Sequence, residues 1–311
     1  MGKLSVIIPL YKGHDTLKQA LHSIAMQSII NDIEIVIIND KDGIGYSDIL
    51  NKFSDLNIKY VTNPQNLGCA GARNTGIKNA TSEYILFLDS DDALASPLSA
   101  ELLYHRAITT NADIVVGEFQ SEMRCDKGVA IKEMKHSATW MHSKLFKKSF
   151  LIDNDLWFVE SLRINEDAEL FQLAVDLGAN IVELNYNCSL WRDNPNSITH
   201  ESLYNNKRSF IDACAEYIKE CNKRCLMNER IVKRVLENLT MIYYYANIVI
   251  DECGDKVEDY MAGSRKYWEL AEPIVKDVDD DLITKVYCNI AKTFEIIPTI
   301  SFIDFLNKLR S

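Results

Sequence analysis

The sequence predicts an α/β domain over residues 1–200, followed by an all-helical module over residues 201–311. In the first part, short apolar runs typical of buried strands alternate with segments in which apolar residues recur at helical spacing. Because such alternation with short connections is typical of βαβ units, we expect a mostly parallel sheet flanked by helices. After residue 200 the strand-like runs vanish, and helical periodicity continues toward the C-terminus.

Each element is predicted from its own pattern. Strands are expected at 4–11, 33–38, 58–62, 84–88, 113–117, 181–184 and 186–191. Helices are expected at 15–25, 47–53, 72–80, 96–110, 143–152 and 166–177, and segment 118–140 is polar and expected to be irregular. The helical module should contain helices at 202–223, 229–251, 257–274 and 281–294.

Composition narrows the class of protein. The 311 residues are 47% hydrophobic and carry a net charge of −11, which disfavours non-specific binding to nucleic acid or to an anionic membrane. Four basic side chains that could form a local patch are expected on a solvated helix surface: Lys144, Lys147, Lys148 and Arg163.

Localisation is predicted from three features of the chain. No apolar run is long enough to span a bilayer, and the N-terminus leads directly into a strand without a signal peptide. The eight cysteines lack CxxC spacing and are expected to be reduced thiols. We therefore expect a cytoplasmic protein.

Three carboxylates follow the apolar run 84–88, namely Asp89, Asp91 and Asp92. Like charges this close repel one another, so the arrangement favours a bound cation. Oxygen ligands suit Mg²⁺ or Mn²⁺, which commonly also bind substrate phosphates. The alternative is an acidic loop that caps the helix expected near Ser96.

Polar groups at four segment ends should converge on the same edge of a parallel sheet. They are Tyr11, Asp40, Arg73 and the acidic turn that begins at Asp89. An aromatic ring, a carboxylate, a guanidinium and a metal site together suit a nucleotide diphosphate, although each group alone has an ordinary structural explanation. Neither GxxxxGK[ST] nor GxGxxG occurs, which disfavours a P-loop and a dinucleotide fold.

Several motifs occur in an order that resembles family 2 glycosyltransferases. They are Ser5–Tyr11, Asn39-Asp40, Asn66–Gly68 with Ala72–Gly76, Tyr84–Asp92, and Asn165–Asp167. The resemblance covers roughly the first 200 residues. It implies a GT-A fold and an inverting, metal-dependent enzyme that uses a nucleotide sugar, with UDP as the expected nucleotide.

The resemblance also implies roles for individual residues. Tyr11 would stack on the base beside Pro9, Asp40 would accept from the uracil imide, and Arg73 would contact base or phosphate. Asp89 would reach the ribose or the metal, Asp91 would ligate Mn²⁺ or Mg²⁺, and Asn66 and Ser90 belong to the same donor site. In the Glu166-Asp167 catalytic pair, Asp167 would be the general base that deprotonates the acceptor hydroxyl.

The segment Trp191–His200 resembles a loop that covers the donor in that family. It implies that Arg192 lies near the diphosphate and that His200 is a metal ligand, although a lone surface histidine is the plainer description. Trp140, Lys144 and Trp157 would line the acceptor side, or pack in the core.

Three positions depart from the family pattern beside the base pocket. Lys12 stands where asparagine is common, Asn39 replaces an aspartate, and Lys41–Gly43 differs from the common Gly-Ser turn. These departures leave the preference for a particular base open.

Two other functions remain open. A nucleotidyltransferase with a similar sheet would usually carry a glycine-rich basic loop, which Pro9–Gly13 matches poorly. The other is a catalytically silent nucleotide-sugar-binding module whose helices mediate assembly.

The acceptor class follows from the resemblance, which implies a hydroxyl on a glycan, on a lipid-linked molecule or on another acceptor. The apolar stripe formed by Val232, Val235, Leu236, Leu239 and Ile242 suits packing on the catalytic domain or on a second copy in a homo-oligomer. Lipid-linked acceptors would place the protein peripherally at the inner face of the membrane.

Overall fold

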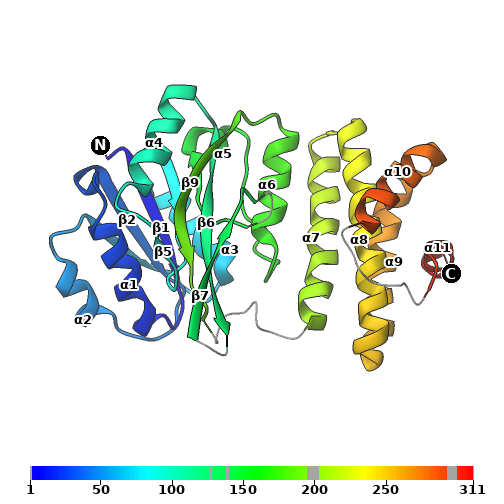
Figure 1. The fold of residues 1–311 in the computed structure, drawn as a ribbon, viewed down its shortest axis with the longest axis horizontal. Coiled ribbons are helices and arrows are strands. Elements are labelled where there is room, and N and C mark those ends of the chain that lie inside the picture. Colours follow the sequence, from blue (N-terminus) through cyan, green and yellow to red (C-terminus); the bar gives the residue numbers. More distant parts are fainter. Residues whose placement is uncertain (1, 126–127, 138–139, 195–202, 293–299, 311) are drawn as a thin grey trace. The chain divides into compact units, whose positions relative to one another are not determined.

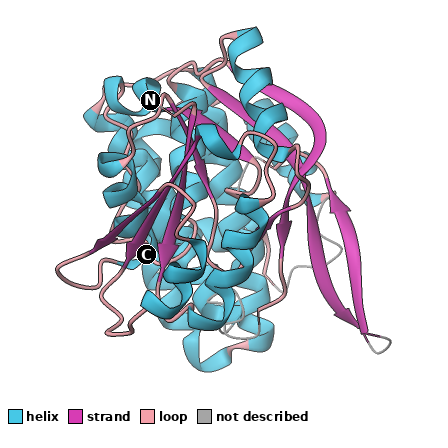
Figure 2. Ribbon diagram, turned by 90° about the vertical axis from the view of Figure 1, so that its left-hand side faces the viewer, coloured by secondary structure: helices cyan, strands magenta, loops and turns pink. Residues whose placement is uncertain are grey.

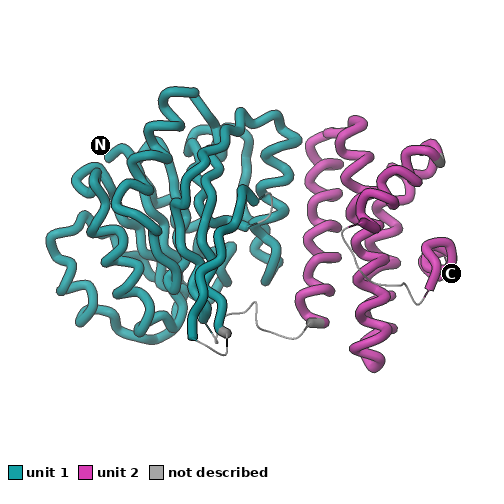
Figure 3. Tube along the Cα trace, in the orientation of Figure 1, with its two compact units in different colours: residues 1–196 teal, residues 197–311 magenta. Residues whose placement is uncertain are grey.

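The computed structural model describes residues 2–125, 128–137, 140–194, 203–292 and 300–310. The chain divides into two compact units, residues 1–196 and residues 197–311 (Figure 3).

Unit 1 is built on a mixed sheet (Figures 1 and 2). Its described strands are β1 (Leu4–Leu10), β2 (Ile33–Asn39), β3 (Ile58–Thr62), β4 (Tyr84–Phe87), β5 (Ala93–Leu94), β6 (Ile114–Cys125), β7 (Gly128–Met134), β8 (Lys144–Lys147) and β9 (Ile181–Trp191). The strand order is β3-β2-β1-β4-β8-β6-β9-β5, and β7 pairs with the outer part of β6.

The parallel half of the sheet agrees with the prediction, whereas the other half does not. Strands β3, β2, β1 and β4 pair in parallel, as expected for consecutive βαβ units. Strand β8 then pairs antiparallel with both β4 and β6, while β6 and β9 are parallel. The sheet is therefore mixed rather than mostly parallel.

Helices cover both faces of this sheet, which explains why its central strands are apolar on both sides. The helices of unit 1 are α1 (His14–Ala25), α2 (Ser47–Leu50), α3 (Gly68–Asn79), α4 (Ser99–Thr110), α5 (Lys148–Asp153) and α6 (Glu166–Asp176). In Figure 1, α1 and α4 lie on one side of the strands and α3 and α6 on the other. All seven residues of β1 and of β2 are buried.

Helix α3 packs closely on β1 because a glycine faces the strand. A Cβ atom at Gly76 would lie 2.3 Å from Cγ2 of Ile7. Real Cβ contacts of this length do not occur, so only glycine permits the helix to approach the sheet this closely. The close packing fixes the position of Arg73, one turn earlier on the same helix.

Three predicted elements were wrong in detail. The segment expected as one helix at 143–152 contains strand β8 followed by the short α5, and the segment expected as irregular at 118–140 continues β6 and forms β7. The two strands expected at 181–191 are one strand, β9, whose pairing with β6 shifts register near Glu118. Strands β8 and β9 pair with partners distant in sequence, so local pattern alone does not determine them, whereas β7 pairs with the neighbouring β6.

Unit 2 is helical in the described residues. It contains α7 (Leu203–Lys223), α8 (Glu229–Glu252), α9 (Val257–Val275), α10 (Asp280–Ala291) and α11 (Phe302–Arg310). The first four agree with the predicted helices to within a few residues, whereas α11 was not predicted. A cluster of buried aromatic side chains joins α8 to α9 and α11, including Tyr243, Tyr260 and Phe305.

Candidate active site

Acidic residues gather where β4 ends. The strand is followed by a tight turn in which the amide of Asp92 donates to the carbonyl of Asp89 at 3.0 Å. Because β1, β2 and β4 are parallel, this turn lies at the same sheet edge as the residues that follow β1 and β2. Ligands of open α/β sheets bind at this edge.

Arg73 joins the turn to helix α6. Its Nη2 donates to Oδ1 of Asp89 at 2.8 Å, and its Nη1 donates to Oε1 of Glu166 at 2.5 Å. The arginine side chain is only 4% exposed, so its contact with Glu166 is shielded from solvent, and its contact with Asp89 is partly shielded. Residues that lie 16 and 93 positions from Arg73 in sequence thus meet on one guanidinium.

The carboxylates outnumber the cations that neutralise them. Burial works against the charge of Asp89, but Arg73 outweighs it and lowers the pKa of Asp89. Burial raises the pKa of Glu166 to about 7 despite Arg73. Burial, reinforced by the charge of Asp89, also raises the pKa of Asp91, and burial raises that of Asp92 to about 6. A bound cation would relieve this repulsion.

Asp167 lies in the first turn of α6, directly after Glu166, which accepts the hydrogen bond from Arg73. Its Oδ1 accepts from the amide of Ala168 at 2.8 Å, and its Oδ2 accepts from the amide of Met141 at 3.1 Å. The N-terminus of a helix stabilises a carboxylate through its free amides. The structure therefore brings the acids of α6 to the same site as the acidic turn after β4.

His142 belongs to this site, although sequence reasoning did not identify it. Its Nδ1 lies 3.4 Å from Oδ2 of Asp92, and its ring stacks on Trp191 with centroids 5.4 Å apart. Burial alone would lower the pKa of His142, but Asp92 outweighs burial and raises it. A single histidine between the segment expected to be irregular at 118–140 and the helix expected at 143–152 gave no signal of this role.

The end of β9 is anchored to the acidic turn. Asp92 accepts from the amide of Arg192 at 2.9 Å, and Asn194 donates to Oδ2 of Asp91 at 2.7 Å. The guanidinium of Arg192 lies 3.7 Å from Glu122. The predicted metal ligand His200 lies outside the described residues.

A second group of predicted residues surrounds the ends of β1 and β2. Asp40 is buried, and its two oxygens accept from Asn63 and from the amides of Leu67 and Gly68 at 2.8–3.1 Å. It therefore holds the loop that carries the exposed Asn66.

Three further donor-site candidates are Tyr11 and Ser90, which lie near the start of α1, and Pro9 in the preceding strand β1. Tyr11 is 49% exposed, and Pro9 is buried in β1. Ser90 lies beside the first turn of α1, because a Cβ atom at Gly13 would come within 2.9 Å of its hydroxyl.

The residues that depart from the family pattern interact with one another. Asp42 accepts from the amide of Lys12 at 2.8 Å, from the Asn39 amide group at 2.9 Å and from the hydroxyl of Tyr46 at 2.5 Å. Lys12 and Lys41 have left-handed backbone conformations with φ of 53° and 58°. Asp42 thus links the loop after β1 to the loop after β2.

The cluster is compatible with a metal ion that also binds phosphate. Within the described residues, no three His, Cys, Asp or Glu side chains form a metal-binding group by themselves. Mg²⁺ and Mn²⁺ need only one or two carboxylates when substrate phosphates supply further oxygens. Asp91, whose pKa is raised by burial and by Asp89, has the donor chemistry and the charge surplus that such an ion requires.

Lys144 was expected on a solvated helix surface, and this expectation was wrong. It begins strand β8, and its side chain is fully buried. The two tryptophans proposed to line the acceptor side with it lie in different places. The ring centroids of Trp140 and Trp191 are 5.7 Å apart. The indole N–H of Trp157 donates a hydrogen bond to Asp155, and the ammonium of Lys78 lies 5.3 Å from the centroid of its ring.

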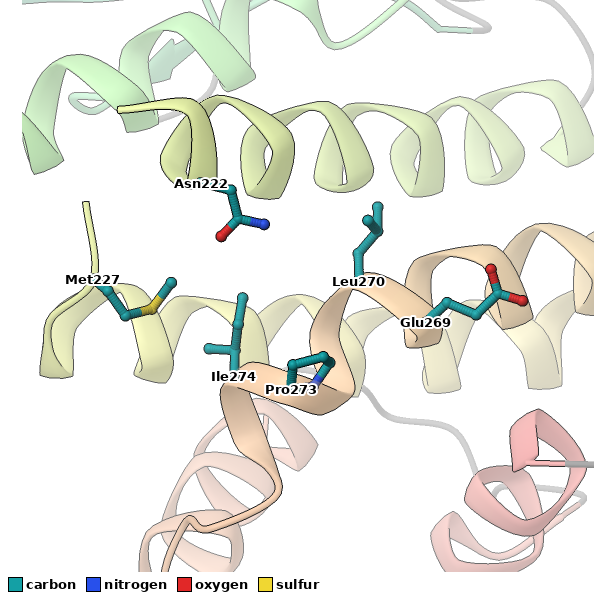
Figure 4. Close-up of a pocket in the computed structure, with 6 residues that line it drawn as sticks. All are labelled: Asn222, Met227, Glu269, Leu270, Pro273 and Ile274. Carbon is teal, nitrogen blue, oxygen red and sulfur yellow. The ribbon is translucent and has the colours of Figure 1, made fainter. Parts of the chain in front are cut away.

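A hollow of about 500 Å³ lies within unit 2 (Figure 4). Figure 4 shows Asn222 of α7 and Leu270 and Ile274 of α9 pointing into the space between these helices. Its lining is mainly apolar and includes a single carboxylate, that of Glu269. It lacks the convergent charged groups found in unit 1.

The described residues contain no helix with both the length and the apolar character needed to cross a membrane.

Solved structures share this fold. Residues 1–349 of Staphylococcus aureus TarS, in complex with UDP-GlcNAc, superpose with a TM-score of 0.65 at 17% identity, covering 96% of this chain and 95% of that one. The mannosyltransferase PcManGT from Pyrobaculum calidifontis, in complex with GDP-Man and Mn²⁺, gives a TM-score of 0.55 at 12% identity, covering 94% and 81% of the two chains. At these identities the likeness establishes the fold, which is GT-A.

Sequence relatives are glycosyltransferases. The poly(ribitol-phosphate) β-glucosyltransferase of Bacillus spizizenii is 31% identical over 53% of this chain and 28% of its own length. The poly(ribitol-phosphate) β-N-acetylglucosaminyltransferase TarP of Staphylococcus aureus is 30% identical over 56% of this chain and 57% of its own. The alignments therefore span less than two thirds of these relatives. The model of glycosyl transferase family 2 matches residues 5–160, and the chain belongs to this family.

Proposed function

We propose that this protein transfers a sugar from a UDP-sugar to an acceptor hydroxyl with inversion at the anomeric carbon. The observation that carries the proposal is Arg73, which contacts Asp89 after β4 and Glu166 at the start of α6. The acidic turn after β4, which suits the donor diphosphate, and the acids at the start of α6, which suit the acceptor, therefore lie at one edge of the sheet. Transfer requires both substrates to meet in one place.

On the donor side, the exposed Tyr11 offers a ring face for the base, and Asn66 lies on the loop that Asp40 holds. Asp40 would have to share an oxygen that already accepts from this loop if it also accepts from the uracil imide. Its main contribution is to hold the loop in place. Arg73, Ser90 and Arg192 lie toward the acidic turn, where the diphosphate would bind.

Asp91 and Asp89 would hold Mn²⁺ or Mg²⁺, with His200 as a further proposed ligand. When bound, the ion supplies positive charge that stabilises the departing diphosphate. Arg73 is already committed to two carboxylates, so its charge is largely neutralised within the protein. This arrangement leaves the diphosphate in need of another cation.

On the acceptor side, Asp167 is the proposed base. As the acceptor oxygen bonds to the anomeric carbon, the bond to the diphosphate oxygen breaks and the hydroxyl proton passes to Asp167. The two backbone amides that donate to Asp167 fix its carboxylate while leaving lone pairs for this proton. Glu166 helps to position the neighbouring Asp167, because Arg73 holds the carboxylate of Glu166 in place.

The acceptor is proposed to be a hydroxyl of a glycan, of a lipid-linked molecule or of a polyol-phosphate chain such as the names of the relatives indicate. We place the reaction in the cytoplasm, where it would need no membrane-spanning segment, and retain the helical module as a candidate surface for homo-oligomers.

A panel of nucleotide sugars tests the proposal. The full chain, incubated with Mn²⁺ and each donor, should release UDP from at least one UDP-sugar, and release should increase when acceptor is added. A nucleotidyltransferase would release pyrophosphate from a nucleoside triphosphate and a sugar phosphate. A silent binding module would bind UDP in calorimetry but release none from any donor, and this result would contradict the proposal.

A further inference from the structure

A lysine lies completely buried beside the acidic helix α6. The side chain of Lys144 has a relative exposure of 0%, although lysine is almost never fully buried without a partner. Its ammonium lies 4.8 Å from the ring centroid of Phe171, one turn beyond Asp167 on α6. Burial lowers the pKa of Lys144 to about 8, and the charge of Asp167 acts against this lowering. A charged group in such a place calls for an explanation beyond packing.

The ammonium of Lys144 donates to the backbone carbonyl of Trp140. The amide of Met141 donates to Oδ2 of Asp167 at 3.1 Å. This carbonyl and this amide belong to the same peptide group, because the bond between residues 140 and 141 joins them. In a trans peptide the C=O and N–H point in opposite directions, so fixing one end aims the other.

Two hydrogen bonds in series therefore connect the ammonium of Lys144 to the carboxylate of Asp167. The ammonium polarises the peptide group by bonding to its carbonyl, and this strengthens the hydrogen bond from the peptide N–H to Asp167. Such charge-assisted bonds are among the strongest in proteins. The other charged groups that act on Asp167 come from different elements: Arg73 of α3, His142 after the peptide, and Glu166 of α6 itself. Lys144 differs from them because it reaches Asp167 through a fixed peptide.

We propose that Lys144 is a positioning residue that holds the carboxylate of Asp167 toward the acceptor through the Trp140–Met141 peptide. The proposal rests on the proposed function, in which Asp167 takes the acceptor proton. It predicts that the charge of Lys144 affects the turnover step and leaves the donor site unaffected, because the diphosphate would bind at the turn after β4.

The test is a double-mutant cycle on the full chain with a UDP-sugar that it uses. Lys144→Met keeps the length of the side chain but removes the ammonium, and we expect kcat to fall about 10- to 100-fold while the KM for donor stays within about twofold. Lys147→Met is the matched control, since Lys147 ends the same strand and bonds to Asn111 instead. Its kcat should stay within about twofold of wild type.

The second half of the cycle asks whether Lys144 acts through Asp167. In an Asp167→Asn background, Lys144→Met should reduce the remaining rate by less than about threefold, because the interaction it supports is already lost. A full 10- to 100-fold loss in that background would mean that Lys144 acts independently and would overturn the proposal. A wild-type kcat in Lys144→Met would overturn it as well.

A neutral polar variant covers the case in which Lys144→Met does not fold, as judged by its melting temperature. Lys144→Gln retains a donor without the charge and should lower kcat about tenfold at unchanged donor KM, so wild-type turnover in this variant would contradict the proposal. Failure of the proposed function has a different signature: the wild-type chain itself would release no UDP from any donor. That result would overturn both proposals.

Discussion

Arg73 shows how one buried residue organises the site. Its guanidinium forms two hydrogen bonds to carboxylates on separate elements, and its side chain is 4% exposed. A buried cation contacted by two acids is costly to leave unpaired, so it constrains both acids to their positions. Glu166 experiences the opposing effect, because burial disfavours its charge more strongly than Arg73 favours it.

This balance predicts a pH dependence of stability. The pKa of Glu166 is raised from 4.5 to about 7 in the folded protein, so between these values the folded state holds a proton that the unfolded state has lost. Its contribution is therefore fully present below pH 4.5 and declines as pH rises toward 7. Glu166→Gln cannot titrate, and its free energy of unfolding relative to wild type should rise by about 1–3 kcal/mol over this window.

Urea denaturation between pH 4.5 and pH 8 measures this difference. Glu83→Gln, which alters an exposed glutamate, is the control and should follow the wild-type curve. Comparison with wild type cancels the other acids of the site, including Asp92. Parallel curves for Glu166→Gln and wild type would show that Glu166 titrates normally.

At the scale of elements, the approach of α3 to β1 determines where Arg73 lies. Gly76→Ala would place a methyl group 2.3 Å from Ile7, in the centre of a buried sheet. We expect a loss of about 1–3 kcal/mol in the free energy of unfolding, as for other overpacked cores. Gly45→Ala is the matched control, because nothing lies within 4 Å of its Cβ position.

The urea midpoints of the two variants provide the measurement. A Gly76→Ala protein as stable as Gly45→Ala would mean that α3 shifts away from β1 at no cost.

Elements with strong local patterns were predictable from the sequence. Strands β1, β2 and β4 are apolar runs buried on both faces, and their ends carried Asp40 and Asp89 to the edge where the structure places them. Strand β8 was not predictable, because Leu145 and Phe146 form a strand only through pairing with β4 and β6. That error also placed Lys144 on the wrong kind of element, which is why its link to Asp167 was missed. His142 lay outside every predicted element, so its contact with Asp92 was missed as well.

At the scale of the whole molecule, a protein with a net charge of −11 concentrates carboxylates at a site proposed for an anionic donor. Such a site needs a cation to attract a diphosphate. We expect UDP to bind the full chain at least about tenfold more tightly in Mn²⁺ than in EDTA. Asp91→Ala should abolish this difference, whereas Asp55→Ala, at an exposed position, should retain it.

Isothermal titration of UDP into each variant, with and without Mn²⁺, measures the effect. Tight UDP binding that is equal in Mn²⁺ and EDTA would contradict the metal assignment. Retention of the Mn²⁺ dependence by Asp91→Ala would move the metal to other ligands.

The two comparisons cover different parts of the chain. The family match lies entirely within residues 5–160, whereas the fold likeness to TarS extends over 96% of the chain. The family assignment therefore rests on unit 1, and the likeness to TarS shows the fold alone.

The central claim is that the turn after β4 binds the donor while Asp167 takes the proton of the acceptor. The substitution Asp167→Asn tests this claim most directly. The substitution keeps the size of the side chain and removes its ability to take a proton, so the variant should bind UDP in Mn²⁺ as wild type does. Transfer from the UDP-sugar that the wild-type chain uses should fall by about 10²- to 10⁴-fold, the range for loss of a general base. If Asp167→Asn instead transfers sugar at a rate close to wild type, Asp167 is not the base and the central claim is wrong.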